Sequence, residues 1–288
     1  MRLLRKTKMT TSKTMTTNYT LPKSLPTNQA AILPDILKER AQRIGLWGLL
    51  AEWSSVSSQP WLATVIEYEE LARAGRSLER RTKMAKLGAF KPIADFDWTW
   101  PKEIDRELID EVFTLDFVSD AANIIIIGSN GTGKTMIAKN LAHQTILRGG
   151  SALFVTASAL LNDLADQHSA AALTRRLRYY LQPQVLVIDE LGYLATSGEH
   201  ADLLFELITR RYQLKSTIIT SNKPFTDWTT VFPNASCVVA LVDRLIHKAE
   251  VITIDAESYR LKDAQERASK RITKRTTTSR STPNNNKV

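Results

Sequence analysis

Residues 123–135, NIIIIGSNGTGKT, constrain this chain more than any other stretch. Four consecutive isoleucines are β-branched and uninterrupted by polar residues, which is typical of a strand buried on both faces of a parallel sheet. Residues 128–135 then match G-x-x-x-x-G-K-[ST] at every fixed position. An amphipathic helix is expected next, so strand, loop and helix follow in the order that a phosphate-binding loop requires. The chain is therefore predicted to bind a nucleoside triphosphate.

The residue types of this loop suit the chemistry of a phosphate chain. Glycines let the loop turn so that its backbone N–H groups surround phosphates at the N-terminus of the following helix. Lys134 is expected against the β- and γ-phosphates, and Thr135 is expected to offer its hydroxyl to Mg²⁺. The predicted nucleotide contacts of the loop are Gly128, Ser129, Asn130, Gly131, Thr132, Gly133, Lys134, Thr135 and Met136.

A second apolar run, residues 184–191, ends in two adjacent carboxylates, Asp189 and Glu190. Open α/β sheets place ligands at the carboxyl ends of their strands, so we expect this strand beside the phosphate-loop strand, with both carboxylates in the same crevice. Asp189 would hold Mg²⁺, usually through water. Glu190 would polarise the water that attacks the γ-phosphate. A simple helix-capping role is the structural alternative.

Three further strands are expected over residues 152–156, 217–221 and 251–254, which gives a five-stranded parallel sheet. Asn222 follows the second of these and is placed to contact the attacking water or the γ-phosphate, although asparagine also begins turns. Arg244 could reach the γ-phosphate of a neighbouring subunit, and an ordinary surface salt bridge is the alternative. Spacing does not decide between the two roles of Arg244.

Composition limits the class of protein. The chain has 288 residues, no apolar stretch long enough to cross a membrane, and no apolar segment of signal-peptide length at its start. Cys237 is the single cysteine, and the four histidines have no ligand spacing, so neither a disulfide nor a zinc site is expected. We expect a soluble cytoplasmic protein.

Basic charge is concentrated in a few segments. The formal net charge is +9, and residues 1–28 hold six basic and no acidic side chains. Residues 73–91 hold seven basic side chains against Glu79 alone. Such clusters are typical of nucleic-acid binding, although a single run is often a solvated helix face. The candidate DNA contacts are Arg80, Arg81, Lys83, Lys86, Arg175, Arg176 and Arg178.

Changes of composition predict the domain organisation. Residues 1–28 are rich in Thr, Lys and Ser and are expected to be a disordered basic tail. Residues 29–91 have helical periodicity and are expected to form a helical domain for DNA binding or assembly, with Trp47, Trp61 and Tyr68 in its core. Residues 92–262 form the predicted nucleotide-binding domain, with a linker over residues 92–101. Residues 263–288 are expected to be a second disordered basic tail.

From about residue 34 to residue 262 the chain resembles the IstB-like ATP-binding proteins, which are similar in turn to DnaC-type helicase loaders of the AAA+ class. The resemblance rests on four stretches besides the phosphate loop. These are LERRTKMAKLGAFKPIADFDW (residues 78–98), VLVIDELGYL (185–194), LFELITRRYQLKSTIITSNKPFTDW (204–228) and LVDRLIHKAEVITIDAESYRLK (241–262). The phosphate loop is generic, whereas the last three stretches together are specific.

This resemblance implies roles that the residues alone do not establish. It makes Asn222 a sensor, Arg244 an arginine finger acting in trans within a homo-oligomer, and Arg260 a candidate nucleotide-sensing arginine. It implies an AAA+ ATPase that uses ATP and Mg²⁺, has no C-terminal lid domain, assembles on double-stranded DNA, deforms it, and recruits and stimulates a transposase. The expected setting is the bacterial cytoplasm.

Three other functions remain open at this point. A replicative helicase loader of the DnaC type would have the same ATPase core but would bind single strands and a helicase. A phosphate-loop kinase would need a small-molecule pocket and a lid, whereas this sequence has basic helices instead. A switch that binds ATP without hydrolysing it is disfavoured by Glu190.

Overall fold

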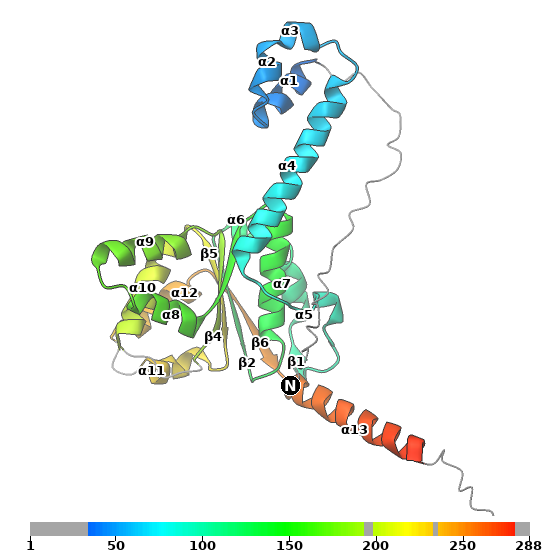
Figure 1. Ribbon diagram of the computed structural model, residues 1–288. Coiled ribbons are helices and arrows are strands. Elements are labelled where there is room, and N and C mark those ends of the chain that lie inside the picture. Colours follow the sequence, from blue (N-terminus) through cyan, green and yellow to red (C-terminus); the bar gives the residue numbers. More distant parts are fainter. Residues whose placement is uncertain (1–33, 193–197, 233–235, 280–288) are drawn as a thin grey trace, which may run out of the picture. The chain divides into compact units, whose positions relative to one another are not determined.

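A computed structural model of the chain describes residues 34–192, 198–232 and 236–279 (Figure 1). The chain divides into two compact units, Met1–Ala72 and Arg73–Val288. The division falls inside the long helix α4 (Leu62–Ala85), because Ala85 and Leu87 are buried in the core of the second unit. The boundary predicted between residues 91 and 92 therefore lies within that unit. The predicted tail over residues 1–28 lies outside the described residues.

The first unit is a small helical module, as predicted. Its helices are α1 (Pro34–Arg43), α2 (Trp47–Ala51), α3 (Trp53–Val56) and the beginning of α4. Gly45 breaks the apolar periodicity between α1 and α2, because its φ of +65° is a left-handed conformation that glycine adopts without a Cβ clash. The module closes by burying four side chains, Leu37 and Ala41 of α1 with Leu62 and Ile66 of α4.

The prediction that the aromatic residues of this module form its core is wrong for three of them, whereas Trp53 packs against the core. Trp47 is 69% exposed, Trp61 44% and Tyr68 63%. On α4 the buried positions Leu62 and Ile66 are one turn apart, and Tyr68 lies on another face of the same helix. Periodicity showed that one face of this helix is apolar, but it did not show which neighbours would cover each position.

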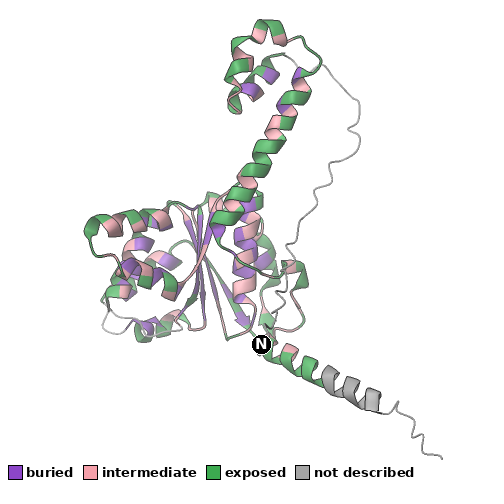
Figure 2. Ribbon diagram, viewed as in Figure 1, coloured by how far each residue is buried: buried purple, intermediate pink, exposed green. Residues whose placement is uncertain are grey.

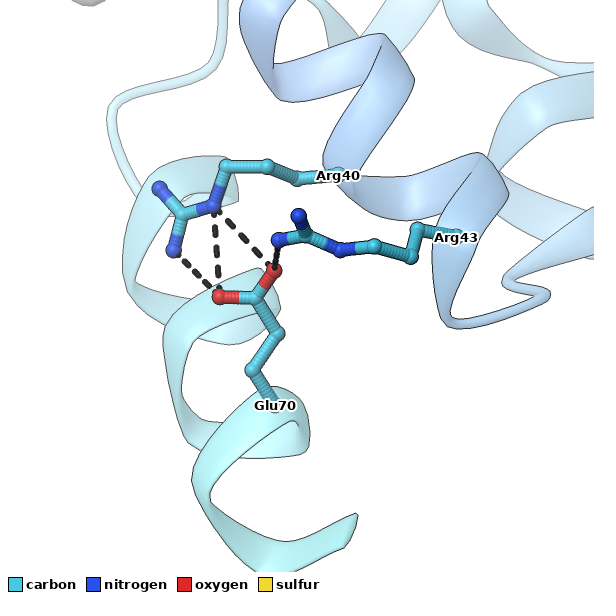
Figure 3. Close-up of polar contacts among 3 residues, drawn as sticks. All are labelled: Arg40, Arg43 and Glu70. Atoms are coloured by element: carbon cyan, nitrogen blue, oxygen red, sulfur yellow. Dashed lines mark hydrogen bonds and ion pairs between the residues drawn. The ribbon is translucent and has the colours of Figure 1, made fainter. Parts of the chain in front are cut away.

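An ion-pair cluster joins α1 to α4 (Figure 3). Arg40 Nη2 donates to Glu70 Oε2 at 2.6 Å, and Arg43 Nη2 donates to Glu70 Oε1 at 3.0 Å. The hydrogen bond from Arg40 is the main cause that lowers the pKa of the Glu70 carboxyl below its usual range, and Arg43 adds to it. Two cations thus hold one carboxylate beside the small apolar core.

The second unit is built on a six-stranded sheet in the order β1-β6-β2-β5-β4-β3. Its strands are β1 (Glu103–Ile104), β2 (Asn123–Gly128), β3 (Ala152–Thr156), β4 (Val185–Leu191), β5 (Ser216–Ser221) and β6 (Ala249–Asp255). Strands β2 to β6 are parallel, which confirms the predicted five-stranded parallel sheet. The short strand β1, which was not predicted, adds to the edge antiparallel to β6.

The predicted neighbourhood of the two motif strands is wrong. Strand β5 lies between β2 and β4, so the carboxylate strand does not pair with the phosphate-loop strand. Ile218 and Ile219 of β5 are in register with Ile124 and Ile125 of β2 on one side and with β4 on the other. All six residues of β5 are buried, and its serine and threonine hydroxyls are hydrogen-bonded, so the strand can occupy this central place between two covered faces.

Helices cover both faces of the sheet, and the central strands β2, β4 and β5 are mostly buried, whereas β6 has four exposed residues (Figures 1 and 2). One face carries α5 (Arg106–Val112), α6 (Asp116–Ser119) and α7 (Lys134–Leu147). The other carries α8 (Ala157–Ala165), α9 (Ala170–Leu181), α10 (Gly198–Arg211), α11 (Trp228–Val231) and α12 (Val238–Ile246). None of the described helices is long and apolar enough to cross a membrane.

A single helix, α13 (Tyr259–Ser279), follows β6 in the described residues, and no lid domain is present there. A disordered tail is predicted from residue 263, but the structure continues the helix to Ser279. Straight-chain helix formers and an i,i+4 ion pair between Asp263 and Arg267 at 2.7 Å favour this helix. Residues 280–288 lie outside the described part of the chain.

A buried arginine joins the amino-terminal ends of β4 and β5. The Arg211 side chain uses all five donors, with Nε on the Thr217 hydroxyl and the other four on backbone carbonyls. Those carbonyls belong to Tyr180, Pro183, Gln184 and Ser216. Burial lowers the pKa of this guanidinium to about 9. The side chain thus satisfies carbonyls at the end of α9, in the turn before β4 and at the start of β5.

We expect Glu70→Gln to reduce the stability of the first unit at pH 7 by about 1 kcal/mol, because two charge-assisted bonds are weakened. The folded pKa of Glu70 is depressed, so its contribution is present above the unfolded value of about 4.3 and is lost as pH falls through the folded value. Hydrogen exchange of the α1 amides should therefore differ between variant and wild type at pH 7. The difference in thermal stability between variant and wild type should shrink when unfolding is measured below pH 4. Glu52→Gln, which makes the same charge change at an exposed site, is the control.

Candidate nucleotide-binding site

The phosphate loop connects β2 to α7 through backbone that only glycine adopts freely. Gly131 has a φ of +80° and Gly133 a φ of +101°. A Cβ at Gly131 would lie 2.3 Å from Ser258 Oγ, and one at Gly133 would lie 2.5 Å from the ring of Phe96. The loop is thus held between two distant segments of the chain. Its glycines are required by close approach as well as by backbone conformation.

Lys134 lies inside the loop, with its side chain 9% exposed. Its Nζ donates to Gly128 O at 2.8 Å and to Ser129 O at 2.7 Å. Burial is the largest cause that lowers the pKa of this ammonium; the charges of Asp189 and Glu190 oppose the shift, and that of Arg260 adds to it. A desolvated ammonium without a salt-bridge partner in contact is suited to an incoming phosphate.

Asp189 lies at the end of β4, is 3% exposed, and is tied to two hydroxyls. Thr135 Oγ1 donates to its two oxygens, at 3.0 and 3.1 Å. Thr220 Oγ1 of β5 donates to its Oδ1 at 2.6 Å. No group of three or more His, Cys, Asp or Glu among the described residues could hold a metal. One hydroxyl and one carboxylate suit Mg²⁺, which keeps several waters and needs few protein ligands.

Glu190 and Asn222 also line the pocket. Glu190 is exposed and has a φ of +62°. The Oδ1 atom of Asn222 is buried without a hydrogen-bond partner. Because a carbonyl oxygen only accepts, this atom suits a water molecule, whereas the amide nitrogen of the same side chain would suit a phosphate oxygen. An unpaired buried acceptor at this place fits a site that is completed by a ligand.

The linker before the sheet and the start of α13 close the pocket, which has a volume of about 330 Å³. Trp100 Nε1 donates to Glu257 O at 2.9 Å, and the Tyr259 N–H donates to Gly131 O at 3.1 Å. Lys262 pairs with Asp97 at 3.1 Å and lies over the Trp100 ring. The apolar and aromatic part of this wall is suited to a nucleobase.

Most of the predicted nucleotide contacts meet at this pocket. Those that line it are Asn130, Gly131, Thr132, Gly133, Lys134, Thr135, Met136, Glu190, Asn222 and Arg260. Gly128 and Ser129 contribute carbonyls to Lys134, and Asp189 lies behind Thr135. The sequence did not identify the linker contacts. An aromatic run over residues 96–100 was visible, but no spacing rule relates it to the phosphate loop.

Arg244 does not line this pocket. It belongs to α12, where it donates to the Thr209 hydroxyl and lies over the Phe205 ring at 4.4 Å. Both of these partners belong to α10, and neither is a carboxylate. The salt bridge that was the alternative for this residue is absent from the described contacts, and the role in a neighbouring subunit stays a prediction.

The seven candidate DNA contacts fall into two groups in the structure. Arg81 donates to Ser77 and to Ile146 O, and Arg176 pairs with Asp163, so these two hold the fold together. The other five side chains are exposed, and they are Arg80, Lys83, Lys86, Arg175 and Arg178. Lys86 Nζ lies 5.4 Å from the centre of the Tyr179 ring on α9. The basic end of α4 and basic helix α9 therefore contribute to one region of the second unit.

Comparison with known proteins identifies relatives for most of the chain. Residues 38–267 match the family described as IstB-like ATP binding protein. A putative ATP-binding protein of insertion sequence IS5376 from Geobacillus stearothermophilus is 35% identical over 75% of this chain and 88% of its own length. Its counterpart of IS21 from Pseudomonas aeruginosa is 36% identical over 75% and 81%. A crystal structure of DnaI is similar over 60% of this chain and 90% of its own, with 21% identity and a TM-score of 0.48.

Gly133→Ala should lower the affinity for ATP by at least roughly tenfold, because its Cβ overlaps the Phe96 ring and displaces either the loop or the pocket wall. Gly149→Ala is the matched control, since Gly149 also has a positive φ, +92°, but meets nothing within 4 Å. Both variants should lose about 1 kcal/mol of stability from backbone strain. Titration with a fluorescent ATP analogue separates the effects, and equal affinities would contradict the proposed role of the close approach.

Proposed function

Since this chain belongs to the family of IstB-like ATP-binding proteins, we propose that it is an ATP-dependent helper of DNA transposition. It assembles on duplex DNA, deforms it, and recruits and stimulates a cognate transposase in the bacterial cytoplasm. The observation that carries the ATP-dependent part is the pocket in which Lys134, the Thr135–Asp189 pair and Glu190 meet. The names of the relatives support the part that concerns insertion sequences.

Hydrolysis of ATP to ADP and phosphate is the reaction that this arrangement favours. The N–H groups of the loop and Lys134 bind the phosphates, and Mg²⁺, held by Thr135 and Asp189, would neutralise charge between the β- and γ-phosphates. Glu190 accepts a proton from the attacking water, and Asn222 Oδ1 orients that water by accepting its other hydrogen. Binding alone would not need an exposed carboxylate beside an unpaired acceptor.

A neighbouring subunit completes this site in our proposal. Arg244 lies outside the pocket of its own chain and is held by a neutral hydroxyl and an aromatic ring instead of a carboxylate. Its cation is therefore available to charge that develops on the γ-phosphate in another subunit. Assembly and hydrolysis are coupled in this way, so that ATP acts as the assembly switch and an isolated subunit turns over slowly.

The DNA contact lies on the second unit. Four exposed cations of α4 and α9, with Lys86 just after α4 and beside Tyr179, form a basic region of one unit. Contacts from such side chains are mainly to phosphates, so binding has little sequence preference and weakens steeply with salt. Arg260, at the start of α13 in the pocket, is the candidate that senses the nucleotide.

Complementation tests the arrangement in trans. Lys134→Ala should abolish nucleotide-dependent assembly, whereas Glu190→Gln should assemble and retain ATP. Glu190→Gln and Arg244→Ala should each hydrolyse ATP slowly, and an equimolar mixture should recover activity, because about one site in four then has both groups when subunits mix at random. An Arg210→Ala variant, which loses an exposed cation on α10, is the control. A mixture no more active than its components would place Arg244 within its own subunit or outside the reaction.

DNA binding is tested by substitution of the exposed cations. Alanine at Lys83, Lys86, Arg175 or Arg178 should each weaken duplex binding and reduce the slope of log K against log salt by about 0.9. Arg210→Ala should change neither quantity. The measurement is duplex binding with and without ATP, with complex size followed in the same sample. Binding to single strands alone would favour a helicase loader, and unchanged slopes would show that these side chains are a solvated surface.

A further inference from the structure

Thr220 lies on the central strand β5 and bridges the two carboxylate residues of β4. Its side chain is fully buried, and it does not line the nucleotide pocket. Its Oγ1 lies 2.6 Å from Asp189 Oδ1 and 2.9 Å from the backbone nitrogen of Glu190. This one hydroxyl of β5 thus bonds to both residues of the Asp–Glu motif, to the side chain of Asp189 and to the backbone of Glu190.

The chemistry of the partners determines the direction of both bonds. A backbone N–H can only donate, so the Thr220 oxygen accepts from Glu190. An ionised carboxylate can only accept, so the single hydroxyl hydrogen of Thr220 goes to Asp189. A hydroxyl group satisfies both requirements at once. Valine has the shape of threonine and satisfies neither.

The backbone of Glu190 needs this bond. The ladder between β4 and β5 is interrupted by a register shift between Ile188 and Leu191, and Glu190 in that interval has a φ of +62°. A left-handed residue that is not glycine is strained, and it persists only where its surroundings hold it. The hydroxyl of Thr220 takes the place of the ladder acceptor that the bulge has removed.

The bond from Thr220 to Asp189 holds the second residue of the motif in place. In the described contacts its carboxylate receives hydrogens from Thr135 and from Thr220. Of these two threonines only Thr135 lines the nucleotide pocket, and its hydroxyl is the proposed ligand of the metal. Thr220 is then the donor that keeps the carboxylate oriented while Thr135 contacts its ligand.

We propose that Thr220 is a positioning residue that holds the carboxylate of Asp189 and the strained backbone of Glu190 in one fixed relation. The inference rests on the hydrolytic function proposed above and extends it to a residue that contacts neither nucleotide nor water. Thr220 acts through Glu190, so its loss affects turnover more than it affects ATP binding.

Substitutions on β5 itself supply the test and its control. Thr220→Val removes the hydroxyl at nearly constant shape, and Thr220→Ser keeps it. Thr217→Val is the control, because it removes another buried hydroxyl of β5 that is hydrogen-bonded to a side chain. Thr217 Oγ1 accepts from Arg211 Nε at 3.1 Å, and Thr217 does not line the pocket. Thr220→Ala serves as the hydroxyl-free variant if the valine does not fold.

Two measurements are made on the full chain. Amide hydrogen exchange at Glu190, followed by NMR without nucleotide, should be faster in Thr220→Val and unchanged in Thr220→Ser and Thr217→Val. In steady-state hydrolysis, kcat should fall roughly tenfold or more in Thr220→Val, with ATP affinity within about threefold of wild type. Thr220→Ser should restore kcat, and Thr217→Val should lower thermal stability alone.

The outcomes separate this inference from the function on which it rests. If wild type hydrolyses ATP and Thr220→Val does so equally well, or if its Glu190 exchange is unchanged, the positioning role is overturned. If wild type does not hydrolyse ATP in any assembly state, the proposed function fails, and unchanged Glu190 exchange would then refute the positioning role separately. Equal loss of kcat in Thr217→Val would also overturn it, since any buried hydroxyl of β5 would then serve.

Discussion

The buried carboxylate of Asp189 is the interaction on which the rest of the second unit depends. It is 3% exposed and receives hydrogens from α7 and from β5, so it connects three parts of the chain at the carboxyl edge of the sheet. A buried charge is tolerated only where hydrogen bonds replace its hydration. The parallel order of β2, β5 and β4 brings those donors to one place. The apolar strands therefore support the site as well as the core.

Elements distant in sequence complete the site around this centre. Phe96 of the linker and Ser258, just before α13, both approach glycines of the phosphate loop, and Lys262 of α13 pairs with Asp97 of the linker. Both segments therefore lie against the backbone of the phosphate loop, and α13 begins with a hydrogen bond from the Tyr259 N–H to Gly131 O.

Charge has different uses in different parts of the molecule. Arg211 is a buried structural cation with five backbone and hydroxyl acceptors, and Arg81 and Arg176 are likewise committed to partners. Lys83 and Arg178 are exposed and have no such partner among the contacts of the described residues. Only the exposed side chains can exchange counterions for a nucleic-acid phosphate without a loss of fold stability. A count of basic residues cannot separate these uses.

The sequence by itself determined the phosphate loop, the five parallel strands and the identity of the carboxylates, because each depends on local periodicity or on fixed spacing within a few residues. It also predicted a helical module ahead of the sheet. Only the tertiary structure decided that β5 separates β2 from β4, that Trp47 and Tyr68 are exposed, and that residues 263–279 are helical. Strand order and burial depend on contacts between distant segments, and no local pattern records which partner a buried face or a hydroxyl such as that of Thr220 will meet.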